Sequence, residues 1–306
     1  MQIPDNRGNY IPASIMSIRN IYWRRLLQTF LVPLLTLLLT LGFLSPAKAA
    51  SVPSRPSATV ANETITVRTD LFVADISTVG GDLTRLELVR YTSADDKTRP
   101  FALFDPKHRY AAQSGLVGEG LPNHQTAFVT TKGPRVMSKD GGKDDKLQLR
   151  LEAVGTNGVK VAKIYTFIRG SYLIDIAYEI ANGSQHPLTA HAYYQFQRDD
   201  VAPAGESEML KTFTGPAIYT GEAKYQKIDF ADINKDKANF AKTADNGWLG
   251  MVQHYFVAAW VPQGNEKREF YVRKMEGGTG SPLVTATGLI LPVAQIAPGA
   301  KGYLSI

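Results

Sequence analysis

GWLGMVQHYFVAAWVP, residues 247–262, is an almost unbroken apolar run between a glycine and a proline, which commonly mark element boundaries. Only Gln253 and His254 interrupt it, and it holds two of the chain's three tryptophans, Trp248 and Trp260. Both alternating sets of positions are mostly apolar, so a strand here would be buried on both faces. A buried helix would be equally apolar, but the aromatic and β-branched residues favour one strand, or two that meet near Gln253. We expect both tryptophan rings to lie in the core of a central strand region.

Short strand-like segments fill much of the chain on either side of this run. They alternate apolar and polar residues, and glycine-rich turn signals such as Gly80-Gly81-Asp82 separate them. The expected strands are 65–67, 71–76, 83–91, 101–104, 127–131, 147–153, 159–168, 172–181, 188–197, 270–273 and 284–291. Strands at this spacing, with little helical periodicity, predict a mainly β fold, a large antiparallel β-sandwich with a few short helices.

Three segments depart from the strand pattern. Residues 230–243 are the best internal candidate for a helix, and residues 198–205 are expected to be a polar loop. Gly115, Gly118 and Gly120 are spaced like part of a phosphate loop but lack its Lys-Ser/Thr, so we interpret them as ordinary loop glycines.

The first 49 residues predict an export segment. Three arginines precede an apolar block at residues 26–44, and Ala47-Lys48-Ala49 follows it as a small-x-small cleavage site. The block is long for a signal peptide and nearly long enough to cross a bilayer, so both a cleaved signal and a retained membrane anchor stay open. Residues 50–64 are small, polar and proline-bearing and are expected to be a linker. In either case, residues 65–306 would form an exported domain.

Composition excludes some classes of partner and of stabilising bond. The chain has a formal net charge of +6, but residues 1–49 hold five basic residues and one acidic residue, which leaves only +2 for the exported part. That balance, without a basic arm, gives no reason to expect nucleic-acid binding. Cysteine is absent, so an exported domain of this size must be held together by its core and not by disulfides.

No catalytic or metal-binding pattern stands out. The five histidines are His108, His124, His186, His191 and His254. None has metal-ligand spacing, so we expect no metal site, no cofactor and no enzymatic activity. His191 and Glu179 are the residues that an epimerase-like acid–base pair would use, but spacing gives no reason to pair them. Gln253 and His254 could serve as a polar handle in a groove, although hydrogen bonds to the sheet or to each other are the simpler expectation.

Three blocks of sequence carry a family resemblance. They are ITVRTDLFVADISTVGGDLTRLEL at 65–88, FTGPAIY at 213–219 followed by EAKYQKIDF at 222–230, and above all GWLGMVQHYFVAAWVP at 247–262. In this order they resemble the large periplasmic domain of the YidC family of bacterial membrane protein insertases. The resemblance runs from about residue 65 to residue 306.

The resemblance implies a β-supersandwich, a fold shared with galactose-mutarotase-like and other sugar-binding domains. It also implies a location at the periplasmic side of the Gram-negative inner membrane. The implied role is the insertion and folding of nascent membrane proteins beside the Sec translocon and its accessory subunits. The family's insertase groove belongs to transmembrane helices that follow this domain, so none of its residues is carried over. The chain resembles a truncated family member, and a stand-alone periplasmic binding or scaffold protein is the alternative.

Overall fold

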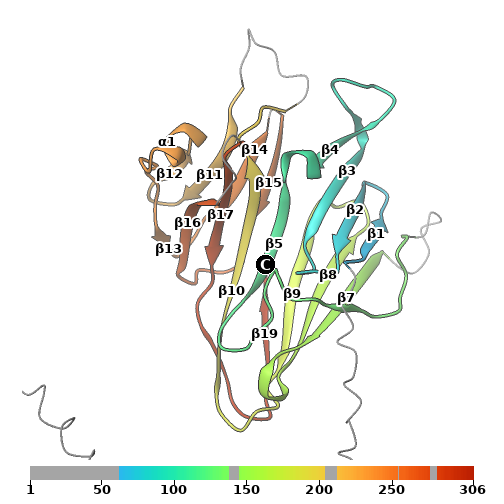
Figure 1. Cartoon of the computed structure of the whole chain (residues 1–306), viewed down its shortest axis with the longest axis vertical. Helices are drawn as coiled ribbons and strands as arrows, with labels where there is room; N and C mark the ends of the chain where they lie inside the picture. The colour runs from blue at the N-terminus through green and yellow to red at the C-terminus, as the bar shows by residue number, and fades with distance from the viewer. Residues whose placement is uncertain (1–61, 138–144, 204–211, 254, 276–280) are drawn as a thin grey trace, which may run out of the picture. The chain divides into compact units, whose positions relative to one another are not determined.

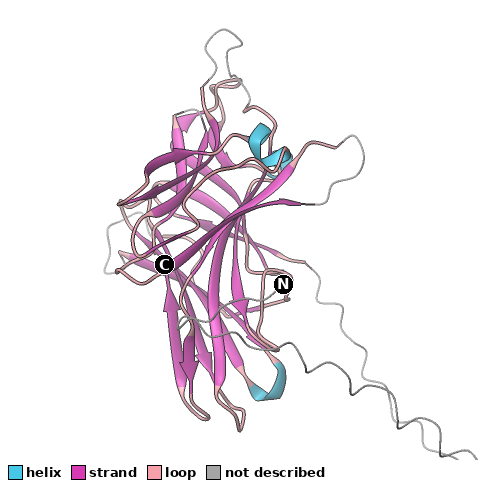
Figure 2. Cartoon of the chain, turned by 90° about the vertical axis from the view of Figure 1, so that its left-hand side faces the viewer, coloured by secondary structure: helices cyan, strands magenta, loops and turns pink. Residues whose placement is uncertain are grey.

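Nearly all of the regular structure is antiparallel β-strand, as the alternation in the sequence predicts. The computed structural model describes residues 62–137, 145–203, 212–253, 255–275 and 281–306. The expected export segment and most of the expected linker lie outside these residues. Within them, helix is limited to short pieces, which Figure 2 shows among the strands. The pieces are α1 (Phe230–Asn234) and the 3-10 segments η1 (Pro106–His108) and η2 (Thr156–Gly158).

A ten-stranded sheet, called the large sheet below, forms one layer. Its strand order is β1-β2-β3-β5-β10-β17-β16-β13, with β4 paired to β3 and β18 paired to β10. The strands are β1 (Thr64–Arg68), β2 (Phe72–Ser77), β3 (Leu83–Thr92), β4 (Pro100–Phe104), β5 (Ala111–Val117), β10 (Leu188–Asp199), β13 (Thr243–Ala244), β16 (Arg268–Met275), β17 (Val284–Ile290) and β18 (Ala294–Ile296). β5 and β10 lie side by side near its middle (Figure 1).

Two smaller sheets lie over one face of the large sheet. The four-stranded sheet has the order β12-β11-β14-β15, and the five-stranded sheet has the order β19-β9-β8-β7-β6. Their strands are β6 (Val129–Thr130), β7 (Lys146–Val154), β8 (Lys160–Ile168), β9 (Ile174–Ala181), β11 (Thr214–Thr220), β12 (Lys224–Lys227), β14 (Trp248–Gln253), β15 (Phe256–Trp260) and β19 (Lys301–Ser305).

One side chain of the large sheet shows how the two smaller sheets are placed. Tyr194 on β10 is fully buried, and its ring centroid lies 5.3 Å from that of Trp260 in the four-stranded sheet. The same ring lies 6.5 Å from Tyr178 in the five-stranded sheet. Both smaller sheets therefore pack on the same face of β10 and share the second layer of the sandwich. The antiparallel sandwich predicted from the sequence is confirmed.

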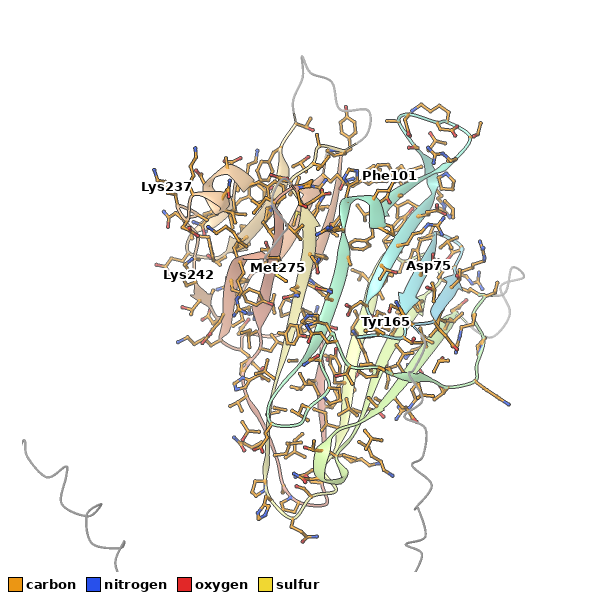
Figure 3. The ribbon with its side chains drawn as sticks, in the orientation of Figure 1. Asp75, Phe101, Tyr165, Lys237, Lys242 and Met275 are labelled. Carbon is orange, nitrogen blue, oxygen red and sulfur yellow. The ribbon has the colours of Figure 1, made fainter. Side chains whose placement is uncertain are left out.

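The Gly80-Gly81 turn between β2 and β3 is the predicted hairpin, and it also ties the two layers together. Both glycines have positive φ, at 74° and 59°, which favours glycine over residues with a Cβ. Lys163 Nζ donates a hydrogen bond to the Gly80 carbonyl at 2.9 Å, and Tyr165 Oη donates one to the Gly81 carbonyl. Both donors come from β8, so they join the five-stranded sheet to the large sheet; Figure 3 labels Tyr165.

The expectation for residues 247–262 is confirmed in part. The run forms two strands, β14 and β15, which pair with each other from Leu249↔Trp260 to Gln253↔Phe256. The expected central position is wrong, because β15 is the last strand of the four-stranded sheet. Burial on both faces is also wrong for β15, because Val257 and Ala259 are exposed. Trp260 is buried as expected, whereas Trp248 is only half-buried and stacks on Tyr219.

Three further expectations need correction. The glycines at 115–120 were expected in a loop, but Gly115 lies within β5, in the middle of the large sheet. The predicted helix over 230–243 extends only over α1, and Thr243 already belongs to β13. The predicted polar loop begins too early, because Arg198 and Asp199 are buried at the end of β10. Small residues in β5 hide this strand from a pattern of apolar alternation, and the charged residues Arg198 and Asp199 hide the end of β10.

Candidate binding cleft

An apolar cleft lies where the two smaller sheets meet above the large sheet. Its volume is about 510 Å³. β15 forms one wall, residues 172–176 at the start of β9 form the other, and β2, β3, β4, β5 and β10 provide the floor. The lining residues are Phe72, Leu83, Leu86, Leu88, Tyr91, Leu103, Phe104, Ala112, Tyr172, Leu173, Ile174, Asp175, Ile176, Phe196, Phe256, Val257, Ala258, Ala259, Trp260, Val261, Gln263 and Ile306.

Aromatic rings fix the β15 wall against the floor. The Phe256 ring stacks on Phe101 of β4 with centroids 4.2 Å apart, and its edge contacts Tyr91 at 5.2 Å. Figure 3 labels Phe101. At the other end of β15, Trp260 stacks on Phe196 of β10 at 5.2 Å. Such ring pairs stabilise an interface beyond their buried area, so they help to hold the β15 wall against the floor.

The chemistry of the lining suits an apolar ligand. Apart from tyrosine hydroxyls, the polar side chains among the described lining residues are Asp175 and Gln263, and these lining residues include no lysine, arginine or histidine. The rim carries exposed apolar side chains, with Leu173 70% exposed and Val257 52% exposed. An apolar cleft that opens to solvent is typical of a binding site for an apolar partner.

The structure keeps apart the two residues that an epimerase would need. His191 lies on β10 of the large sheet, where its Nδ1 is 3.3 Å from the Leu291 carbonyl oxygen. Glu179 lies on β9 of the five-stranded sheet, where it accepts a 2.6 Å bond from Arg150. Neither residue lines the cleft. Each side chain therefore has a partner of its own, and the pair shares no site.

The other polar residues considered as candidates are possible metal ligands and the pair Gln253 and His254. No group of three or more His, Asp or Glu residues in the described part of the chain could hold a metal ion. Gln253 is buried at the end of β14, and its Oε1 has no hydrogen-bond partner among the described residues. His254 lies outside these residues, so the hydrogen bond expected between the two stays a prediction.

A buried polar cluster lies between the large and five-stranded sheets, away from the cleft. Lys163 and Asp82 are both buried, with Nζ and Oδ1 3.9 Å apart. Gln113 Nε2 donates a 2.9 Å hydrogen bond to Asp82, and Lys163 also donates to the Ser114 carbonyl at 3.3 Å. Burial raises the pKa of Asp82 to about 6 and lowers the pKa of Lys163 to about 8, although each partner's charge opposes the shift. The cluster links the two layers, and its two ionisable groups are buried.

The cleft is not predicted by the sequence. Its lining comes from seven strands and from residues next to them, and only the fold brings them together. One available signal was Tyr172-Leu173, an apolar pair placed just before the alternating part of β9. Another was β15 itself, which is apolar at every position although the sheet buries only one of its faces.

Comparison with known proteins agrees with the resemblance seen in the sequence. Residues 64–306 match the family described as the YidC periplasmic domain. The chain belongs to this family. The match covers all three sheets and ends with the last residue, so the YidC-like part includes the cleft and the buried cluster.

The similar full-length proteins are named as insertases. The chain is 57% identical over 244 residues to the "Membrane protein insertase YidC" of Dechloromonas aromatica, covering 80% of this chain and 43% of that protein. It is 52% identical over 239 residues to the protein of the same name from Aromatoleum aromaticum, covering 77% and 42%. The chain thus spans less than half the length of these relatives. The names of these relatives describe membrane protein insertion.

Solved structures show a more distant likeness. A galactose mutarotase related enzyme from Lactobacillus acidophilus aligns over 79% of this chain and 95% of its own, with a TM-score of 0.49 and 9% identity.

Among the described residues, no helix combines the length and the apolarity needed to cross a membrane.

Proposed function

We propose that this chain is the periplasmic part of a YidC-type insertase and that its cleft receives apolar segments of nascent inner-membrane proteins. The cleft carries the proposal, because it is the place where the described surface offers a deep apolar lining with exposed apolar rims. A segment emerging from the membrane exposes apolar side chains to water, and burying each one is favourable by about 1.5–3 kcal/mol. Transient shelter of such a segment is a chaperone-like role that needs no catalytic residue.

The proposal assigns a place to the rest of the chain. Residues 1–49 act as a signal peptide or membrane anchor, residues 50–64 as a linker, and residues 65–306 as the periplasmic domain. This places the cleft on the periplasmic side of the inner membrane. The Sec translocon and its accessory subunits are the proposed neighbours, because they deliver the segments that the cleft would receive.

Site-specific photocrosslinking tests this proposal. A photoreactive amino acid replaces Val257, which is 52% exposed at the cleft rim, and the full chain is expressed in a Gram-negative host. We expect crosslinks to an inner-membrane protein arrested during insertion, and crosslinks to Sec subunits in the same cells.

Val154 gives the matched control position. It is also an exposed valine, at 71%, but it lies at the end of β7 and not in the cleft. Equal crosslinking of the arrested chain from both positions, or none from Val257, would contradict the proposed role of the cleft.

A further inference from the structure

Strand β15 turns its backbone edge toward the cleft. It does not line the cleft with only one of its two side-chain faces. Six consecutive residues, 256–261, line the cleft. Successive side chains of a strand point to opposite faces, so a strand that shows only one face contributes every second residue. β15 pairs with β14 on one side and is the last strand of its sheet. Its unpaired edge therefore faces the cleft.

The hydrogen-bonding pattern identifies the backbone groups on that edge. The carbonyl of Pro216 on β11 accepts a bond from the Ile228 N–H, so Pro216 faces away from its β14 partner, Met251. Met251 must then direct its N–H and C=O toward Ala258 of β15, because these groups alternate in direction along an antiparallel strand. Val257 and Ala259, on either side of Ala258, direct theirs into the cleft.

This edge lacks the protection that the other described sheet edges have. Charged residues or very short strands usually keep an edge from pairing with another chain. β1 carries Arg68, β12 carries Lys224 and Lys227, and β19 carries Lys301. β6 and β13 have only two residues each, and β18 has three. β4, which pairs only with β3, begins at Pro100, and its pairing is interrupted by register shifts. β15 reads FVAAW, with five residues and no charge.

We propose that an extended apolar segment of a nascent membrane protein adds to β15 as a new edge strand of the four-stranded sheet. Val257 and Ala259 form its backbone hydrogen bonds, and alternate side chains of the segment enter the apolar floor. Six lining residues correspond to about 20 Å of strand at about 3.3 Å per residue. Asp175 is the one ionisable residue of the lining other than tyrosines, so the segment is free of acidic residues. This inference rests on the proposed function and specifies how the cleft holds its ligand.

Residue-resolved hydrogen exchange tests strand addition directly. The full chain is reconstituted in lipid nanodiscs, and the probe is a ten-residue peptide of alternating Leu and Ser with one terminal Lys. We expect the peptide to slow exchange of the Val257 and Ala259 amides at least tenfold. The Ala258 amide, which is already bonded to β14, should change little. If the chain in nanodiscs without the peptide already shows the same protection of these amides, lipid occupies the edge and the proposal is wrong.

A proline substitution provides a second measurement. Ala259→Pro removes the N–H that faces the cleft, and proline is tolerated at such edge positions. We expect peptide affinity to fall at least tenfold, while the melting temperature stays near that of the parent. Lys227→Pro makes the same change on β12, the opposite edge of the same sheet, and should leave affinity within twofold. If Ala259→Pro fails to fold, the exchange experiment still decides.

The outcomes separate the two proposals. A peptide that binds without protecting Val257 and Ala259, and that binds Ala259→Pro as tightly as the parent, would overturn strand addition. The cleft would then remain a binding site for apolar segments. Failure of the peptide to bind at all would also overturn strand addition. The proposed function itself depends on crosslinking of the arrested chain at Val257.

Discussion

Asp82 and Lys163 place two ionisable groups where water cannot solvate them. Their charged atoms are 3.9 Å apart, so attraction offsets only part of the cost of burial. The remaining stabilisation comes from the hydrogen bonds of Lys163 to the Gly80 and Ser114 carbonyls and of Gln113 to Asp82. These bonds connect the β2–β3 turn, β5 and β8, and they specify how the two layers face each other.

The raised pKa of Asp82 predicts a particular pH dependence of stability. The pKa is 3.8 in the unfolded reference and about 6 in the fold, so between these values the folded state holds a proton that the unfolded state has released. Stability therefore falls as pH rises through this window. We compare the free energy of unfolding of the wild type with that of Asp82→Asn. We expect the difference, wild type minus variant, to fall by up to ~3 kcal/mol between pH 4 and pH 6.

Urea unfolding of both proteins at half-unit pH steps measures this difference. The comparison with Asp82→Asn removes the contribution of all other carboxylates, which act alike in both proteins. A difference that rises with pH over the same window would show that attraction to Lys163 outweighs burial at Asp82.

At the scale of elements, the β14–β15 hairpin is the feature on which the cleft depends. Arg268 of β16 is buried and holds both ends of residues 247–262, donating to the Gly247 carbonyl at 3.1 Å and lying within 3.5 Å of the Pro262 carbonyl. It also donates to the Asp245 and Gly264 carbonyls, at 3.0 and 2.8 Å. A planar guanidinium can satisfy several carbonyls at once, which fixes the hairpin to the large sheet.

The two tryptophans of the hairpin should differ in their contribution to stability. Trp260 is buried against Tyr194 and Phe196, so Trp260→Ala should cost about 3–5 kcal/mol. Trp248 is half-buried between Tyr219 and Tyr225, and Trp248→Ala should cost roughly half as much, because less apolar area is lost. Urea midpoints at one pH measure both. An equal loss from the two variants would mean that Trp248 is as well packed as Trp260.

The sequence predicted where the strands lie along the chain better than it predicted which strands pair with each other in the sheets. Period-two alternation places Tyr172, Ile174, Ile176, Tyr178 and Ile180 on one face. The last three are buried, whereas Ile174 is half-buried and Tyr172, which lies before β9 begins, is exposed. The apolar composition of β15 reads as a fully buried strand, yet Val257 is exposed because β15 is an edge. Edge or centre is decided by which distant strands pair, and apolar patterning alone carries no information on pairing. A cleft whose lining comes from three different sheets is hidden from the sequence for the same reason.

At the scale of the whole molecule, the large sheet joins strands from both ends of the described chain. β1 and β2 belong to the same sheet as β16 and β17, and β10 joins the two halves, so the sheet forms only when residues as distant in sequence as Tyr193 and Ile290 have met. Residues 58–306 form one compact unit. The buried residues that make up the core begin at Ile65. The fold should therefore depend on β1 and be independent of what precedes it.

Truncation tests this dependence. A chain that begins at Ala58 should unfold in one cooperative transition, with the stability of about 5–15 kcal/mol that is typical of a domain. A chain that begins at Asp70 lacks β1 and loses Ile65 and Val67 from the core, which should cost about 3–6 kcal/mol. Circular dichroism during urea unfolding compares the two chains at matched concentration. Equal midpoints would show that β1 adds nothing to the sandwich, and a non-cooperative Ala58 chain would show that the core needs residues before it.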